Sequence, residues 1–493
     1  MKKRSAYLAI DFGTSNVHAS VIDAETTRII VNTNKKYGWY YPAQNQVELH
    51  IDETWKASEW AVGEVIRHLP EDVELLAITF SYFGDSITPV DEKGEALYGM
   101  IPGFCGRSFK EVQTIGREIG ADTYAKITGN TLSTLATPSK IMWLRDNEPE
   151  VFKKAAGFYS NQQYVMRKLG LGDVQDRTMA ARKLMIDVKA NCWSAPILEL
   201  AGVTEQQLGS QIVESATVVG TIDHYGSVRL PRTLPVTIGC HDVSASLLSA
   251  GVRLENPDTI GVLMGTYEQM GYFSDTFVDG CNDFGDSLIF SCCYSSPFNN
   301  KYTVMDAFPT AGALLEWFCK NILRDPSADI GKLIADAKLD GTGSLMMLPY
   351  VENFHGAVVG MSLSTTTDEI FAAILESLAY QFVACVDYIR STRKQPFTRL
   401  HFGGGGSRTD KLLQLRADLI QAPLGRMQNI ELPSLGACML AGLGNNWYAS
   451  VEDAAAHMGN PVSYFEPIPE NETKYAERYA KYKAISADYL RHY

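Results

Sequence analysis

A carboxylate and a hydroxyl-bearing turn follow the first apolar run of the chain, in "YLAIDFGTSN" at residues 7–16. Asp11 ends this run, and Gly13, Thr14 and Ser15 follow it. Glycine lets the backbone approach a ligand, and the hydroxyls beside it can donate hydrogen bonds to phosphate oxygens. A carboxylate at such a turn suits Mg²⁺, often through water. The stretch predicts either a phosphate-binding turn or a plain hairpin turn in which Asp11 accepts backbone hydrogen bonds.

Two further glycine-containing turns follow apolar, strand-like runs in the second half. Gly265 and Thr266 follow one run, and the four glycines at 403–406 follow another and lead into a helical pattern. The N-terminal N–H groups of that helix favour an anion or the edge of a nucleotide. No turn fits the G-x-x-x-x-G-K-[ST] phosphate loop, and the first turn leads into a strand instead of the helix of a dinucleotide-binding fingerprint. Taken singly, each is also compatible with a structural turn.

The segment "GCHDVSASLLSAG" at 239–251 holds the second candidate carboxylate. Cys240, His241 and Asp242 are adjacent, but consecutive strand residues point to opposite faces, so the three do not suit one metal ion. Small residues after Asp242 predict a helix. Asp242 is then either its N-cap or a general base at the mouth of a cleft.

Length and composition bound the class of protein. A chain of 493 residues predicts two or three domains, and its apolar fraction of 45% with 20% charged residues is that of an ordinary globular protein. The net charge of −13 argues against nucleic acid and anionic membrane surfaces as general partners. It does not exclude an anionic ligand, because a few local N–H groups can bind phosphate.

Cysteine usage and the N-terminus predict a cytoplasmic protein. The nine cysteines are dispersed without a C-x-x-C pair, which is typical of reduced core thiols. "MKKRSAYLAIDFG" has too short an apolar run for a signal peptide, and no run approaches the roughly 20 apolar residues of a spanning helix.

Strand and helix patterns alternate in both halves, which predicts an α/β fold. Polar residues and Pro257 at 251–259 mark a domain boundary. On either side of it, both halves begin with a strand, a Gly-Thr turn and a second strand, as though one fold occurs twice. Strands are predicted at 6–13, 18–25, 28–34, 73–84 and 399–402, and a long helix at 368–392.

Six segments, in this order and spacing, resemble the FGGY family of carbohydrate kinases, members of the actin/hexokinase/Hsp70 superfamily. The resemblance covers nearly the whole chain. The segments are "AIDFGTSN", "TPSKIMWLRDNEPEVFKKA", "GCHDVSASLLSAG", "VLMGTYEQ", "PTAGALLEWF" and "GGGGSRTDKLLQLRADLIQAPL" with "LPSLGACMLAGLG".

The resemblance implies two actin-like (ribonuclease H-like) α/β domains flanking a central cleft. Residues 1–253 would bind the sugar and supply the catalytic base, and residues 254–493 would bind ATP. Asp242 would take the proton from the attacking sugar hydroxyl, and Asp11 would coordinate Mg²⁺. Asp85 in "SYFGDSITPVDEKG" would bind the substrate; the alternative is that it is an exposed turn residue. The implied nucleotide-binding residues are Gly13, Thr14, Ser15, Gly265, Thr266, Gly312, Glu316, Gly404, Gly405 and Gly406.

Departures from the family pattern keep alternatives open. His18 stands where members often carry Arg or Lys, and Tyr267 follows the second Gly-Thr pair. "GFCGR" at 103–107 replaces the Trp-Asn-Asp-Thr-Arg stretch of many pentulose kinases, and Gly84 precedes Asp85 where a glycerol kinase would have Arg. The reading is an ATP-dependent kinase of a sugar, ketose or polyol. The alternatives are a glycerol kinase-like polyol kinase and a non-catalytic actin-like ATP-binding switch, and a homodimer is one open oligomeric state.

Overall fold

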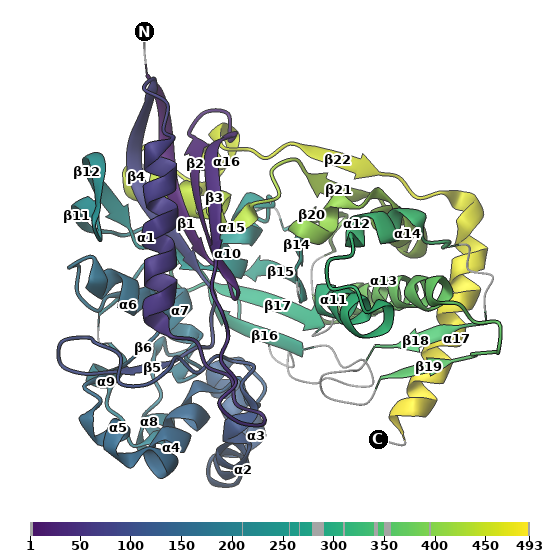
Figure 1. The fold of residues 1–493 in the computed structure, drawn as a ribbon, viewed down its shortest axis with the longest axis horizontal. Helices are drawn as coiled ribbons and strands as arrows, with labels where there is room; N and C mark the ends of the chain where they lie inside the picture. Colours follow the sequence, from purple (N-terminus) through teal and green to yellow (C-terminus); the bar gives the residue numbers. More distant parts are fainter. Residues whose placement is uncertain are drawn as a thin grey trace.

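The chain folds around two β-sheets, one in each half of the sequence (Figure 1). The computed structural model describes residues 3–209, 211–255, 257–265, 267–278, 290–308, 311–339, 344–349, 356–393 and 396–491. Both halves mix strands with covering helices, as the α/β expectation requires.

The first sheet has the strand order β11-β12-β4-β1-β2-β3, with β13 also paired to β4. β1 runs antiparallel to β2 and parallel to β4, and β13 runs parallel to β4. β1 and β4 are buried over most of their length, as expected for central strands covered on both faces. The strands are β1 (Arg4–Phe12), β2 (Asn16–Asp23), β3 (Ile29–Lys36), β4 (Val73–Tyr82), β11 (Val218–Tyr225), β12 (Val228–Thr237) and β13 (Cys240–His241).

Helices and three small strand pairs complete the first half. The helices are α1 (Ile51–Arg67), α2 (Phe109–Glu118), α3 (Ala121–Thr128), α4 (Thr137–Asn147), α5 (Pro149–Lys154), α6 (Asn161–Lys168), α7 (Arg177–Ala181), α8 (Ala195–Ala201), α9 (Glu205–Leu208) and α10 (Asp242–Ser249). The strand pairs are β5 (Thr88–Val90) with β6 (Gly157–Tyr159), β7 (Gln175–Asp176) with β10 (Ile212–Val213), and β8 (Ile186–Asp187) with β9 (Cys192–Trp193).

The second sheet repeats the central topology of the first. Its order is β16-β17-β15-β14-β20-β21-β22. β14 is antiparallel to β15 and parallel to β20, as β1 is to β2 and β4. The repeated fold predicted from the two strand–Gly-Thr–strand patterns is therefore confirmed. The strands are β14 (Thr259–Met264), β15 (Glu268–Ser274), β16 (Phe290–Ser295), β17 (Tyr302–Phe308), β20 (Arg399–Gly403), β21 (Leu424–Met427) and β22 (Val462–Phe465), beside a separate pair, β18 (Met346–Leu348) and β19 (Ala357–Val359).

The helices of the second half include one that is long and apolar enough to cross a membrane. This helix, α13 (Thr367–Thr392), has 78% of its most apolar window buried inside the protein, so it is a core helix. The others are α11 (Gly312–Phe318), α12 (Ile330–Asp336), α14 (Asp410–Ile420), α15 (Leu432–Gly444), α16 (Val451–His457) and α17 (Glu472–Leu490). The eight cysteines within the described ranges form no disulfide bond with one another.

Helices α10 and α15 cross in close contact and join the two halves. A Cβ on Gly436 of α15 would lie 1.8 Å from the carbonyl oxygen of Ala245 in α10, so only glycine fits there. Although α15 comes late in the sequence, it packs on β1 and β4 of the first sheet. The Thr79 hydroxyl of β4 donates to the Ala437 carbonyl at 3.2 Å. A helix from the second half of the sequence thus covers part of the first sheet.

Gly436→Ala is expected to destabilise the protein, because the added methyl collides with backbone that cannot rotate away. Overpacking of this kind costs about 1–3 kcal/mol. Helix propensity alone predicts the opposite sign, since alanine is favoured over glycine by about 1 kcal/mol within a helix. Thermal unfolding should show a lower midpoint for this variant. Gly38→Ala is the control, since its Cβ would meet nothing within 4 Å; a Gly436→Ala midpoint at or above that of the parent would refute the tight crossing.

Candidate active site

Two of the predicted carboxylates lie at the carboxyl ends of β1 and β13, two strands that both pair in parallel with β4. Asp11 is the penultimate residue of β1, and Asp242 directly follows β13. Ser81 of β4 lies between them in the sheet, because it pairs in register with Asp11 on one side and with Cys240 on the other. The carboxyl ends of parallel strands share one edge of a sheet, where α/β proteins commonly bind ligands.

Asp11 is buried and hydrogen-bonded through one oxygen. Its side chain accepts a hydrogen bond from the Ser81 hydroxyl at Oδ1, at 2.6 Å, and the residue is 9% exposed. Burial raises the pKa of Asp11 to about 6, and the Ser81 hydrogen bond and the nearby His18 act in the opposite direction. Within the described ranges, Oδ2 has no hydrogen-bond partner, so it can take a ligand.

The turn after β1 presents its hydroxyls outward. The Gly13 N–H donates to the Asn16 carbonyl at 3.0 Å, and the Tyr37 hydroxyl donates to the Gly13 carbonyl. Thr14 is half-buried and Ser15 exposed. Neither of these two hydroxyls is hydrogen-bonded to a residue that the structure describes, so both are available to a ligand.

Asp242 is the first residue of α10 and faces partly open space. Its Oδ1 accepts a hydrogen bond from the Val243 N–H at 2.7 Å, and 29% of the side chain is exposed. Burial, followed by the negative charge of Asp11, raises the pKa of Asp242 to about 8. The N-cap of the helix is His241, so Asp242 does not occupy the N-cap position itself.

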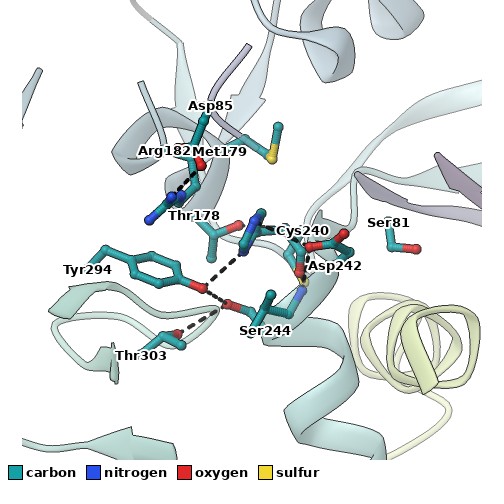
Figure 2. Close-up of polar contacts among 12 residues, drawn as sticks. Ser81, Asp85, Thr178, Met179, Arg182, Cys240, Asp242, Ser244, Tyr294 and Thr303 are labelled. Atoms are coloured by element: carbon teal, nitrogen blue, oxygen red, sulfur yellow. Dashed lines mark hydrogen bonds and ion pairs between the residues drawn. The ribbon is translucent and has the colours of Figure 1, made fainter. Parts of the chain in front are cut away.

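Asp85 is held by an arginine that the sequence did not point to. Arg182, directly after α7, donates to Asp85 Oδ2 (Figure 2). It also donates to Asn130 Oδ1 at 3.0 Å. The Arg182 guanidinium also lies 5.0 Å from the centre of the Tyr294 ring. Asp85 Oδ1 and Arg182 Nε are buried, and neither has a hydrogen-bond partner among the residues that the structure describes. Asp85 is therefore not an exposed turn residue. The ion pair with Arg182 fixes its side chain and leaves Asp85 Oδ1 and Arg182 Nε as the two polar atoms that could bind a ligand.

The glycine turns of the second half also meet. β14 and β20 are parallel and pair Leu263 with Gly403, so the turns that follow these strands start side by side. The Gly312 N–H donates to the Gly265 carbonyl at 3.2 Å. Gly404 has φ +83°, and a Cβ there would lie 2.7 Å from the Met264 carbonyl oxygen, so this position requires glycine.

The other predicted nucleotide-binding residues of the second half differ in how closely neighbouring atoms surround them. A Cβ on Gly405 would meet nothing within 4 Å, and one on Gly406 would lie 3.0 Å from the Met264 Cβ. Glu316 is exposed on α11 and makes no hydrogen bond or ion pair with another described residue of the predicted site. Thr266 lies outside the described residues.

One short segment connects the glycine turns of the second half to the carboxylates of the first. The Gly404 N–H donates to the Ile430 carbonyl at 3.2 Å. The next residue, Glu431, lies with Oε2 4.0 Å from the Nδ1 atom of His18, which pairs with Asp11 across the β1–β2 ladder. The two sets of predicted residues are thus linked through Ile430 and Glu431.

Sequence reasoning missed several residues around the carboxylates. Arg182, Tyr37 and Tyr294 stand in stretches with no periodicity or motif that sets them apart, and His241 was considered only as a metal ligand. Among the described residues, no group of three or more His, Cys, Asp or Glu side chains could hold a metal ion. Of these residues, only His241 carried a sequence signal, because it directly precedes the candidate base Asp242.

Comparison with known proteins gives the same picture along the whole chain. The model of the N-terminal domain of the FGGY family of carbohydrate kinases matches residues 6–249, and that of the C-terminal domain matches residues 286–444. The chain is 24% identical to the xylulose kinase of Lactococcus lactis over 97% of this chain and 96% of the relative. It is 25% identical to the glycerol kinase of Desulforamulus reducens over 92% of each.

The fold is shared with solved kinases. The crystal structure of gluconate kinase from Lactobacillus acidophilus superposes with a TM-score of 0.84 at 18% identity and covers 100% of both chains. Both family domains occur here in the family's order, on two sheets of repeated topology. The chain belongs to the FGGY family of carbohydrate kinases, phosphotransferases that act on an alcohol group, and has their actin-like α/β fold.

Proposed function

We propose that this enzyme transfers the γ-phosphate of ATP to a hydroxyl of a sugar, ketose or polyol, with Asp242 as the general base. The observation that carries the proposal is the placement of Asp242 beside Asp11, at a sheet edge linked through Ile430 and Glu431 to the glycine turns of the second half. Phosphoryl transfer needs mainly positioning, charge neutralisation and a base near the nucleophile.

Mg²⁺ fits the residues around Asp11. This ion prefers oxygen ligands and is usually held by one or two carboxylates together with substrate phosphates, so a single carboxylate with an unpartnered oxygen suits it. When bound, the ion would neutralise charge on the phosphates. Gly13, Thr14 and Ser15 would contact phosphate from the first half.

The nucleotide would lie against the turns of the second half. The proposed contacts are Gly265, Thr266, Gly312, Glu316, Gly404, Gly405 and Gly406. The domain division at residue 253 stays a prediction; it falls between the two matched segments. A cytoplasmic location and a homodimer stay predictions too.

The sugar subsite is proposed at Asp85. Its unpartnered Oδ1 and the neighbouring Arg182 Nε offer one acceptor and one donor, which is the pair that a hydroxyl group needs. Because Arg182 occupies the other carboxylate oxygen, the pair presents a fixed polar surface instead of a free carboxylate.

A substrate panel separates the alternatives. Purified protein is supplied with ATP and ketoses, aldoses, sugar acids or polyols, and ADP release is measured. Turnover on glycerol alone would favour the glycerol kinase-like alternative. ATP binding without acceptor-dependent ADP release across the panel would favour the switch and overturn the proposal.

Asp242→Asn should lower kcat on the true substrate by about 10²–10⁴-fold, the usual contribution of a general base. ATP binding should persist, since the amide keeps the shape of the side chain. Steady-state kinetics with a separate nucleotide-binding titration make the measurement. A loss of turnover smaller than tenfold would exclude Asp242 as the base.

The parent enzyme supplies a pH control. The raised pKa of Asp242 means that the carboxyl is protonated below about pH 8. Because the base must be deprotonated, kcat/KM should rise with pH by about tenfold per unit below that pKa and level off above it. The residual activity of Asp242→Asn should lack this limb.

Asp11→Asn should weaken the response to Mg²⁺, because the amide removes the negative charge but keeps the contact with Ser81. Loss of the outer partners of a metal ligand costs about 10–100-fold, so loss of the ligand itself should raise the activating Mg²⁺ concentration at least tenfold. Mg²⁺ titrations at fixed ATP compare the variant with the parent. Superimposable curves would rule out a metal role.

Asp85→Asn should raise the sugar KM by about tenfold to a hundredfold, because a hydrogen bond to a charged group contributes about 1.5–3 kcal/mol. The ATP KM should stay within about twofold. Asp91→Asn is the matched control, since Asp91 accepts only backbone hydrogen bonds from Lys93 and Glu95 nearby. If the ATP KM changes instead, or if the sugar KM stays normal, the sugar pocket lies elsewhere.

A further inference from the structure

His241 lies between Asp242 and a tyrosine of the second sheet. Its Nε2 is 3.3 Å from Asp242 Oδ1, and its Nδ1 is 3.0 Å from the hydroxyl of Tyr294 on β16. The His241 backbone N–H donates to Thr178 Oγ1 at 2.8 Å. The imidazole is held from several sides and is 4% exposed.

The contacts continue beyond Tyr294 as a chain of hydroxyls. Tyr294 lies 3.4 Å from Ser244 Oγ, which lies 3.2 Å from Thr303 Oγ1 on β17 (Figure 2). A polar path therefore runs from the second sheet to the carboxylate. Figure 2 shows the Tyr294 hydroxyl directed toward Ser244.

When Asp242 is ionised, the hydrogen bonds along this path can all point the same way, with each group donating toward the Asp242 carboxylate. Burial, followed by the charge of Arg182, lowers the pKa of His241 well below its usual value, so the ring is neutral and only one nitrogen carries hydrogen. If that nitrogen is Nε2, it faces the carboxylate, and Nδ1 must accept from Tyr294. Each hydroxyl from Thr303 onward can then donate toward Asp242.

The arrangement also fixes which oxygen is left for the substrate. Asp242 Oδ1 accepts from the Val243 N–H and faces His241 Nε2, so Oδ2 is the free oxygen. Hydrogen bonds aligned in one direction strengthen one another. The comparable case is an orienting partner that holds a catalytic side chain in one tautomer and one rotamer.

We infer that His241 and Tyr294 are positioning residues that hold the Asp242 carboxylate, through Oδ1, in the orientation in which Oδ2 accepts the proton of the substrate hydroxyl. The inference rests on the proposed role of Asp242 as the base. It also makes the base depend on β16 of the second sheet, so the two halves must be in register for the base to be oriented. His241 and Tyr294 touch the base and not the substrate.

Other charged and titratable groups face this site, and they stay unchanged in the test. They are Asp11 at the end of β1, Asp85 after β4, Arg182 after α7, and Tyr37 after β3. A variant that alters only the Tyr294 hydroxyl leaves all of these in place. Tyr294→Phe also keeps the aromatic ring beneath Arg182.

Tyr294→Phe should lower kcat by about tenfold to a hundredfold, the range found when partners that orient a functional histidine are removed. The sugar KM should stay within about twofold. The rising limb of kcat/KM should move to higher pH, because the carboxylate loses donors aimed at it. Thr303→Val, at the far end of the path, should give the same changes at smaller amplitude.

Tyr225→Phe is the matched control for loss of a buried tyrosine hydroxyl, since Tyr225 donates to Ser58 Oγ in the first half. It should leave kcat and the pH limb unchanged. Unchanged kcat and pH limb in Tyr294→Phe would overturn the inference. So would a loss that appears equally in the sugar KM and in thermal stability, which marks a structural role. If Asp242→Asn itself keeps its turnover, the proposed base falls and this inference falls with it.

Discussion

The close crossing of α10 on α15 is the constraint on which the site depends. Gly436 lets the backbone of α15 approach the Ala245 carbonyl of α10 closely. Because Asp242 is the first residue of α10, the same contact fixes the position of the candidate base. Interiors are packed as densely as organic crystals, so a displacement there is not absorbed locally. The position of Asp242 is therefore coupled to a helix that also covers β1 and β4, the strands that carry Asp11 and Ser81.

Charge is concentrated where the two halves meet. Asp11 is buried and Asp242 is partly exposed beside it, and both pKa values are raised, so the protein alone does not neutralise this site. A divalent cation and a substrate that removes water would relieve that imbalance. By contrast, the buried Arg416 and Glu268 elsewhere in the second half form two hydrogen bonds of 2.5 and 2.7 Å and neutralise each other. The first pair has the features of a binding site and the second those of a structural link.

Local patterns in the sequence were sufficient for the five strands and the long helix that were predicted, and for the turns that follow those strands. Asp11 lies near the end of an apolar strand, the Gly13 turn and Gly404 each follow one, and the repeated topology follows from two such patterns. The partner of Asp85 could not be predicted, because Arg182 lies 97 residues away and no periodicity connects them. The packing of α15 on the first sheet depends on a backbone contact at Gly436, which only coordinates reveal. The contact between Tyr294 and His241 could not be predicted either, because the two residues are 53 positions apart in the sequence and only the folded arrangement of the two halves brings them together.

We propose that this site directs the γ-phosphate of ATP to a sugar hydroxyl and not to water. The most direct test of this proposal uses ATP labelled in the γ-phosphate with the acceptor found active, and compares label in phosphorylated sugar with label in inorganic phosphate. For the parent enzyme, almost all of the transferred label should be in the sugar phosphate. For Asp242→Asn, almost no labelled sugar phosphate should form. Label recovered mainly as inorganic phosphate from the parent enzyme, or sugar phosphate formed equally by both proteins, would contradict it.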